Sequence, residues 1–110
     1  MRDFRSSLLA ILLLLSPLSP ARADTGECVI LLHGLARTEA SFAVMELVFE
    51  ARNYTVVRPG YPSTDLPIPE LADQTLPSAV AACGDKKVNF VTHSMGGILL
   101  RYWLQDNQPA

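Results

Sequence analysis

Three short apolar runs alternate along this chain with longer segments in which apolar residues recur at helical spacing. The runs lie at 28–32, 54–58 and 88–92 and are rich in aliphatic, β-branched and aromatic residues, which is typical of buried strands. Strands that alternate with helices form parallel sheets through right-handed crossovers. The pattern therefore predicts an α/β fold with three parallel strands.

Three helices are predicted between and after these strands. The first follows Thr38, a residue type that caps helices, and stops at Asn53, which tolerates the left-handed conformation of a helix end. The region from Pro67 to Cys83 is predicted to form two shorter helices or one kinked helix, because Pro77 lacks a backbone donor. The third helix ends near 106–109. Apolar residues recur in the first helix at Phe42, Met45, Val48 and Phe49, and those expected to be buried in the third are Ile98, Leu99, Tyr102 and Trp103.

The junction between the third strand and the third helix carries the strongest chemical motif. The sequence Thr92-His93-Ser94-Met95-Gly96 places a serine between small residues. A strand that reverses into a helix within so few residues brings Thr92 and Gly96 close together, so bulk would clash there. Ser94 would sit at the helix N-terminus, where free N–H groups and the helix dipole favour a developing negative charge. Its alternative role is an ordinary serine cap.

A second motif precedes the serine turn, where the first strand opens into His33-Gly34-Leu35. Read as G-x-S-x-G with Thr92 at the first glycine position, the serine turn resembles the nucleophile elbow of α/β-hydrolases. With the His-Gly loop, and Tyr61-Pro62-Ser63-Thr64 after the second strand, the chain from Cys28 to Trp103 resembles the bacterial lipase/esterase-like branch of that superfamily. The resemblance implies the N-terminal half of the fold, an incomplete sheet with the 88–92 strand at its edge.

The resemblance also implies acyl transfer by serine, which needs a nucleophile, a base, an acid and two oxyanion donors. Ser94 would be the nucleophile, and the backbone N–H groups of Leu35 and Met95 would be the donors. The implied substrates are small-molecule or lipid esters, and no cofactor or metal is implied. Residues expected to support the site are His33, Gly34, His93 and Gly96.

The acid and the base of a serine triad are missing from this pattern. In the superfamily the chain order is Ser, then Asp or Glu, then His. His33 belongs to the oxyanion loop, and the side chain of His93 is expected to leave the turn away from Ser94 and pack beside the sheet. Asp106 lies about 18 Å down the helix from Ser94 at 1.5 Å per residue. We therefore expect a fragment of a longer hydrolase, inactive alone.

Two alternatives to an ester hydrolase stay open. A thioesterase, an amidase or an acyltransferase could use the same serine turn, because one fold hosts many chemistries. From a different class, the chain could be a catalytically dead module that binds acyl groups or a partner. A downstream Asp or Glu and a later His would favour the enzyme.

The N-terminus has the composition of an export signal. Arg2 and Arg5 precede the apolar run Leu8 to Leu15, and Ala21-Arg22-Ala23 fits a small-x-small cleavage site. The run is too short for a membrane anchor, which needs roughly 20 residues. We expect residues 1–23 to be a signal peptide and 24–110 a partial α/β-hydrolase domain, periplasmic or secreted, with no transmembrane segment after cleavage.

The net charge argues against nucleic-acid binding, and the two cysteines predict a disulfide. The formal net charge is −2, and Lys86-Lys87 is the only basic pair beyond the leader, so nucleic-acid binding has no basis. Outside the cytoplasm Cys28 and Cys83 can form a disulfide. In the α/β-hydrolase fold the strands beside them are parallel neighbours, which puts both cysteines at the non-catalytic end of the sheet. The alternative is two unpaired small hydrophobic residues.

Overall fold

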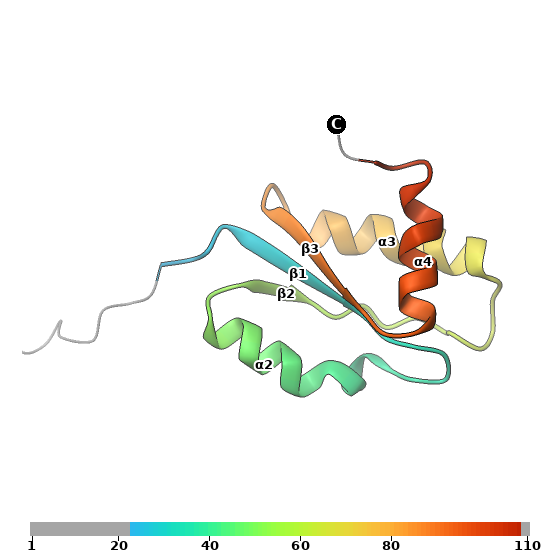
Figure 1. Ribbon diagram of the computed structural model, residues 1–110, viewed down its shortest axis with the longest axis horizontal. Coiled ribbons are helices and arrows are strands. Elements are labelled where there is room, and N and C mark those ends of the chain that lie inside the picture. The colour runs from blue at the N-terminus through green and yellow to red at the C-terminus, as the bar shows by residue number, and fades with distance from the viewer. Residues whose placement is uncertain (1–22, 109–110) are drawn as a thin grey trace, which may run out of the picture.

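A three-stranded parallel sheet forms the centre of the protein in the computed structural model, which describes residues 23–108 (Figure 1). Its strands are β1 (Glu27–Leu32), β2 (Thr55–Val57) and β3 (Lys87–Thr92). They lie in the order β2-β1-β3, so β1 is central and β3 is an edge. The predicted parallel α/β sheet is confirmed, with β3 at its edge as expected. The predicted signal peptide, apart from Ala23, lies outside the described residues.

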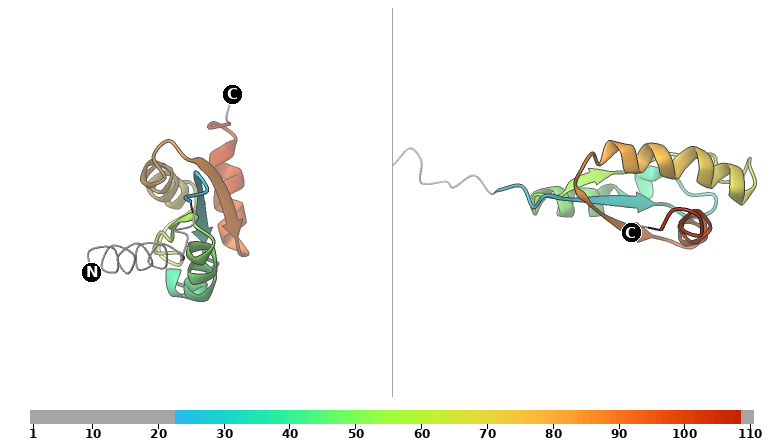
Figure 2. Two further views of the ribbon diagram at one scale, coloured as in Figure 1. Left: turned by 90° about the vertical axis from the view of Figure 1, so that its left-hand side faces the viewer. Right: turned by 90° about the horizontal axis from the view of Figure 1, so that it is seen from above.

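Helices cover both faces of this sheet, α2 on one side and α3 with α4 on the other (Figure 2). Within residues 23–108, none of them is both long and apolar enough to cross a membrane. Their bounds are η1 (a 3₁₀ helix, Glu39–Phe42), α2 (Ala43–Ala51), α3 (Ile68–Ala82) and α4 (Met95–Leu104).

The core is built on β1, whose residues from Cys28 to Leu32 are all buried. Successive side chains of a strand point to opposite faces. One face, which carries Ile30, packs against α3 and α4, and the other, which carries Leu31, packs against Phe42 and α2. A central strand covered on both faces has no polar side, which is why its sequence is a continuous apolar run.

The first helix begins later than the sequence predicts. Thr38 precedes the 3₁₀ turn η1 rather than an α-helix, and its side chain makes no capping hydrogen bond. The α-helix α2 starts only at Ala43. Its end agrees with the prediction, since Asn53 adopts a left-handed φ of +66° just beyond the helix.

α3 is one continuous helix, although Pro77 lies inside it. Of the two predicted alternatives, two shorter helices is therefore wrong, and a single helix that contains Pro77 is the one that forms. Proline removes the hydrogen bond to the carbonyl four residues earlier, here that of Asp73. Both Asp73 and Pro77 are exposed, so water can solvate that carbonyl, while Leu76 and Ala79 stay buried against the sheet. Packing of the inner face of α3 against the sheet thus keeps the helix continuous, although one hydrogen bond is missing on its outer face.

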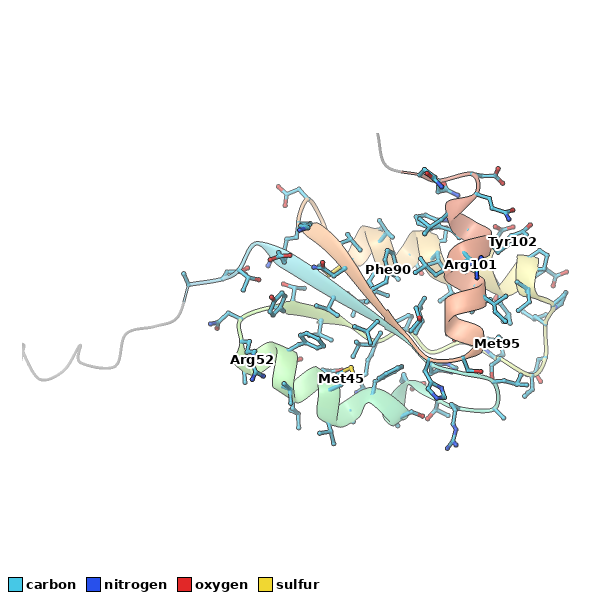
Figure 3. The ribbon with its side chains drawn as sticks, in the orientation of Figure 1. Met45, Arg52, Phe90, Met95, Arg101 and Tyr102 are labelled. Atoms are coloured by element: carbon cyan, nitrogen blue, oxygen red, sulfur yellow. A yellow bond between two sulfur atoms is a disulfide. The ribbon has the colours of Figure 1, made fainter. Side chains whose placement is uncertain are left out.

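α4 buries fewer side chains than predicted. Leu99 is fully buried and Trp103 is partly buried, in agreement with the prediction, but Ile98 is 56% exposed and Tyr102 also faces solvent. Figure 3 shows Tyr102 beside Arg101 on α4, with Met95 at the start of the helix. The helix rests on α3 and β3 through its Leu99 side, and no described element covers the side of Ile98 and Tyr102.

The two cysteines form a disulfide between the start of β1 and the end of α3. The Cα atoms of Cys28 and Cys83 are 5.7 Å apart, and both residues are buried. The bond closes a loop with a sequence separation of 55. It lies at the end of the sheet opposite Ser94, as predicted from the sequence.

Candidate active site

Ser94 occupies a sharp turn between β3 and α4. Its backbone has φ +51° and ψ −119°, a conformation that residues other than glycine rarely adopt. Ser94 stands at the N-cap position of α4, yet its side chain makes no capping hydrogen bond, and the residue is exposed. The turn therefore presents the hydroxyl to solvent instead of using it to cap the helix.

The first turn of α4 lies directly on the end of β1. A Cβ atom added to Gly96 would be 2.4 Å from the carbonyl oxygen of Leu32 and 3.0 Å from that of His33. The backbone N–H of His93 donates to the same Leu32 oxygen at 3.1 Å. The end of β1 therefore requires a small residue at Gly96, as the sequence predicts. A Cβ atom added to Gly97 would instead be 3.2 Å from the hydroxyl oxygen of Thr92.

The His-Gly loop packs against the serine turn. A Cβ atom on Gly34 would be 2.7 Å from Nδ1 of His93 and 3.3 Å from Cβ of Ser94. Leu35, which follows Gly34 in this loop, is 57% exposed. Met95 opens α4, and the first N–H groups of a helix have no partner within it. The loop that carries Leu35 thus contacts the serine turn through Gly34, and Ser94 directly precedes α4.

His33 is built into the loop rather than offered to Ser94. It is 1% exposed, and its Nδ1 lies 3.0 Å from the carbonyl oxygen of Gly34. A carbonyl only accepts hydrogen bonds, so Nδ1 is the donor in this contact. That Nε2 atom is buried and has no hydrogen-bond partner among the described residues. His33 is thus held by its own loop, and no hydrogen bond joins it to Ser94.

Tyr61 and Ser63 belong to the site, although sequence reasoning used them only as part of a family motif. The hydroxyl of Tyr61 donates to the carbonyl of His33, and the two rings stack with centroids 3.8 Å apart. Burial raises the pKa of Tyr61 to about 12, so its phenol stays a neutral donor at physiological pH. Ser63 accepts a hydrogen bond from the backbone N–H of Ala36 at 3.0 Å. The signal in the sequence was the pair of hydroxyl-bearing residues, Tyr61 and Ser63, on either side of Pro62 in the loop after the second strand.

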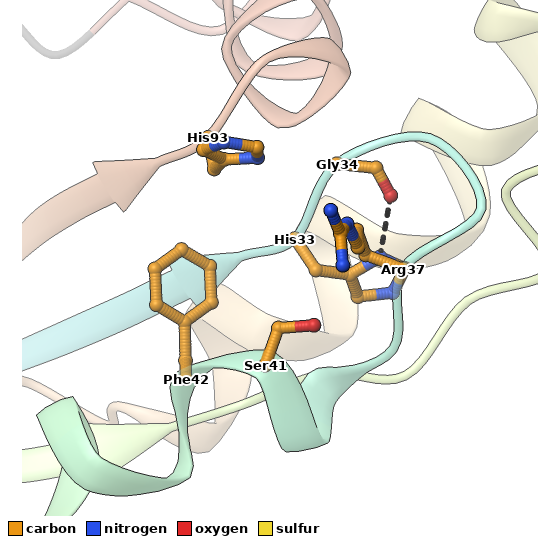
Figure 4. A pocket seen from close by; sticks show the side chains of 6 residues that line it. All are labelled: His33, Gly34, Arg37, Ser41, Phe42 and His93. Atoms are coloured by element: carbon orange, nitrogen blue, oxygen red, sulfur yellow. Dashed lines mark hydrogen bonds between the residues drawn. The ribbon is translucent and has the colours of Figure 1, made fainter.

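A cavity of about 200 Å³ opens beside the loop, lined by His33, Gly34, Arg37, Ser41, Phe42 and His93. Figure 4 shows His93 on the opposite side of this cavity from Ser41 and Phe42. His93 is exposed and lies against Gly34, so the expectation that it packs beside the sheet is wrong. Gly34 lacks a side chain, which leaves room for the imidazole there.

The hydroxyl of Ser94 has no hydrogen-bond partner among the described residues. Among residues 23–108, neither histidine makes a hydrogen bond with its hydroxyl, and Asp106 lies at the exposed end of α4. The same residues hold no cluster of three or more His, Cys, Asp or Glu able to bind a metal ion. Within the described residues, the hydroxyl of Ser94 therefore has no side chain hydrogen-bonded to it.

Comparison with protein families supports the interpretation of the fold. The sequence model of the alpha/beta hydrolase family matches residues 29–106, which run from β1 through α4. The chain belongs to the alpha/beta hydrolase family. The matched region includes the His-Gly loop, the loop after β2 and the serine turn. Neither curated proteins nor solved structures gave a significant match.

Proposed function

We propose that this protein is an exported serine hydrolase that acts on carboxylic esters through an acyl-enzyme on Ser94. The observation that carries the proposal is the backbone of Ser94, held at φ +51° in a turn that presents an uncapped hydroxyl next to the His-Gly loop. Such conformations are retained where the surrounding structure enforces them, and they concentrate at active sites. Family membership indicates hydrolase chemistry in general and leaves the substrate open.

The proposed reaction has two steps. The Ser94 oxygen attacks the ester carbonyl, a base removes the serine proton, and the alcohol leaves with a proton as the acyl-enzyme forms. Water then attacks the acyl-enzyme and releases the acid. In each step the negative charge on the former carbonyl oxygen would be stabilised by the N–H groups of Leu35 and Met95, together with the positive end of the α4 dipole.

The base and acid are contributed, in this proposal, by a part of the parent hydrolase that lies beyond the described residues. His33 is excluded because its Nδ1 donates to Gly34 and its Nε2 is buried. His93 lies over Gly34 on the cavity side of the turn and makes no hydrogen bond with Ser94. A serine at its ordinary pKa is a weak nucleophile without such a partner.

Ester substrates and export have their own support. Next to Ser94 the exposed Leu35 side chain and the cavity wall at Phe42 offer apolar surface for an acyl group. The Cys28–Cys83 bond suits an oxidising compartment, in keeping with the leader-like composition of residues 1–23.

A fluorophosphonate probe tests the nucleophile, because it labels activated serines covalently. The parent hydrolase, which supplies the base and the acid, should be labelled at Ser94, and Ser94→Ala should abolish both labelling and hydrolysis of p-nitrophenyl butyrate. Ser78→Ala is the matched control, since Ser78 lies on the exposed side of α3 and bonds only helix carbonyls. Labelling that persists in Ser94→Ala would rule out the assignment.

Substrates that share a butyryl group but differ in the leaving group distinguish an esterase from a thioesterase or an amidase. Turnover of the butyrate ester well above that of a butyryl thioester and a butyryl anilide is expected of a carboxylic-ester hydrolase. A preference for the thioester or the anilide would replace that substrate class while keeping Ser94 as nucleophile. An unlabelled protein that binds butyrate esters without hydrolysing them would instead be an acyl-binding module.

A further inference from the structure

Two hydrogen bonds from the loop after β2 hold the loop that carries the proposed oxyanion donor Leu35. Tyr61 donates to the carbonyl of His33, and Ser63 accepts from the N–H of Ala36. We propose that Tyr61 and Ser63 are positioning residues, which hold the N–H of Leu35 toward the oxyanion formed at Ser94. The inference rests on the proposed function of Ser94.

The bond from Ser63 stabilises an unfavourable backbone conformation. Ala36 has φ +56°, in the left-handed region where a side chain crowds the backbone. Ser63 is only 7% exposed, so water competes poorly for its hydroxyl. Because the N–H of Ala36 belongs to the peptide plane that follows Leu35, the 3.0 Å bond fixes the chain immediately after the donor.

The bond from Tyr61 fixes the chain immediately before the donor. The carbonyl of His33 belongs to the peptide plane between His33 and Gly34, and it accepts the phenol proton. The stacked imidazole of His33, with ring planes 11° apart, limits rotation of both side chains. Tyr61 is itself buried and is a neutral donor at physiological pH.

Between these two fixed planes lies the one peptide that contains the Leu35 N–H. Its carbonyl, that of Gly34, accepts from the N–H of Arg37 at 3.1 Å and from Nδ1 of His33 at 3.0 Å. No peptide bond in the described part is cis, and in a trans peptide the N–H points opposite to the carbonyl. Because hydrogen bonds hold the Gly34 carbonyl on one side of this peptide, the Leu35 N–H points to the opposite side.

Kinetics of the parent hydrolase test this role. Tyr61→Phe and Ser63→Ala should each lower kcat for p-nitrophenyl butyrate about tenfold, less than loss of a whole oxyanion donor, with KM changed less than twofold. Ala36→Gly in the Ser63→Ala background should recover part of kcat, because glycine adopts a positive φ without steric cost. Amide hydrogen exchange at Ala36 should accelerate in Ser63→Ala.

Matched controls separate positioning from general stability. Thr64→Ala removes an exposed hydroxyl that bonds only Asp65, and Tyr54→Phe removes a phenol whose ring packs edge-on against Phe49, away from the site. Both should keep wild-type kcat. If Tyr61→Phe and Ser63→Ala match these controls, or if they raise KM without lowering kcat, the positioning role is refuted while Ser94 stands. If Ser94→Ala still hydrolyses the ester, the proposed function fails, and this inference fails with it.

Discussion

At the scale of single residues, Gly96 and Gly97 are neighbours in α4 that face different surroundings. A methyl group at Gly96 would meet the backbone oxygens of Leu32 and His33 at 2.4 and 3.0 Å, and neither oxygen can move without distorting β1. A methyl group at Gly97 would meet only the side chain of Thr92, at 3.2 Å. Adjacent glycines of the same helix therefore tolerate substitution differently.

We predict that Gly96→Ala lowers the free energy of unfolding by more than about 2 kcal/mol, because the added atom overpacks against a central strand. Gly97→Ala should change stability by less than about 1 kcal/mol, since the higher helix propensity of alanine offsets the tight contact with Thr92. Urea denaturation of the two variants measures both values. Equal losses in stability would contradict the packing described at the end of β1.

The sequence alone predicted the sharp turn at Ser94 and the small residue at Gly96, because a strand that turns into a helix constrains residues close together in the chain. The roles of Tyr61 and Ser63 could not be predicted in this way, because their contacts are not local in the chain. Their partners, His33 and Ala36, lie 28 and 27 residues away, and only the folded chain brings them together. Local patterns thus predict turns, whereas the supports of a turn depend on tertiary contacts.

At the scale of elements, periodicity predicted which segments are strands and helices but less well what each helix buries. The apolar spacing of α4 marks Ile98 and Tyr102 for the core, yet both are exposed because no described element packs on that side. At Pro77 the sequence left two alternatives, a broken helix and a single one. Burial of Leu76 and Ala79 keeps α3 a single helix, and this tertiary contact could not be predicted from helix propensity.

The disulfide joins two of these elements, β1 and α3, and we predict a large effect of removing it. Cys28→Ala/Cys83→Ala should lower the free energy of unfolding by about 4 kcal/mol in the loop-entropy model, given the sequence separation of 55. Trp103, the single tryptophan, reports unfolding in urea by fluorescence. Reduced wild type should unfold at the same urea concentration as the double variant. If reduction leaves the midpoint unchanged, the bond does not stabilise the fold.

At the scale of the whole molecule, β3 leaves apolar surface uncovered on both of its faces. On one side a groove of about 630 Å³ runs between β3 and α2, lined by Val44, Met45, Val48 and Val91 among others. On the other side a hollow of about 520 Å³ is lined by Phe90, Trp103 and neighbouring residues. The backbone groups on the outer edge of β3 have no strand beside them among residues 23–108. An open edge between two apolar hollows is a typical template for strand pairing between chains.

We therefore predict that residues 24–110, the chain without the expected signal peptide, self-associate through β3. Val91→Lys places a charge on this edge strand and should shift the chain toward monomer in sedimentation velocity runs at increasing concentration. Ile98→Lys is the matched control, because Ile98 is an exposed apolar residue of α4 that lines a different groove, away from β3. Circular dichroism should show both variants folded, so that a change in association is not a change in fold. A wild-type chain that stays monomeric, or equal dissociation by the two lysines, would show that the β3 edge does not drive association.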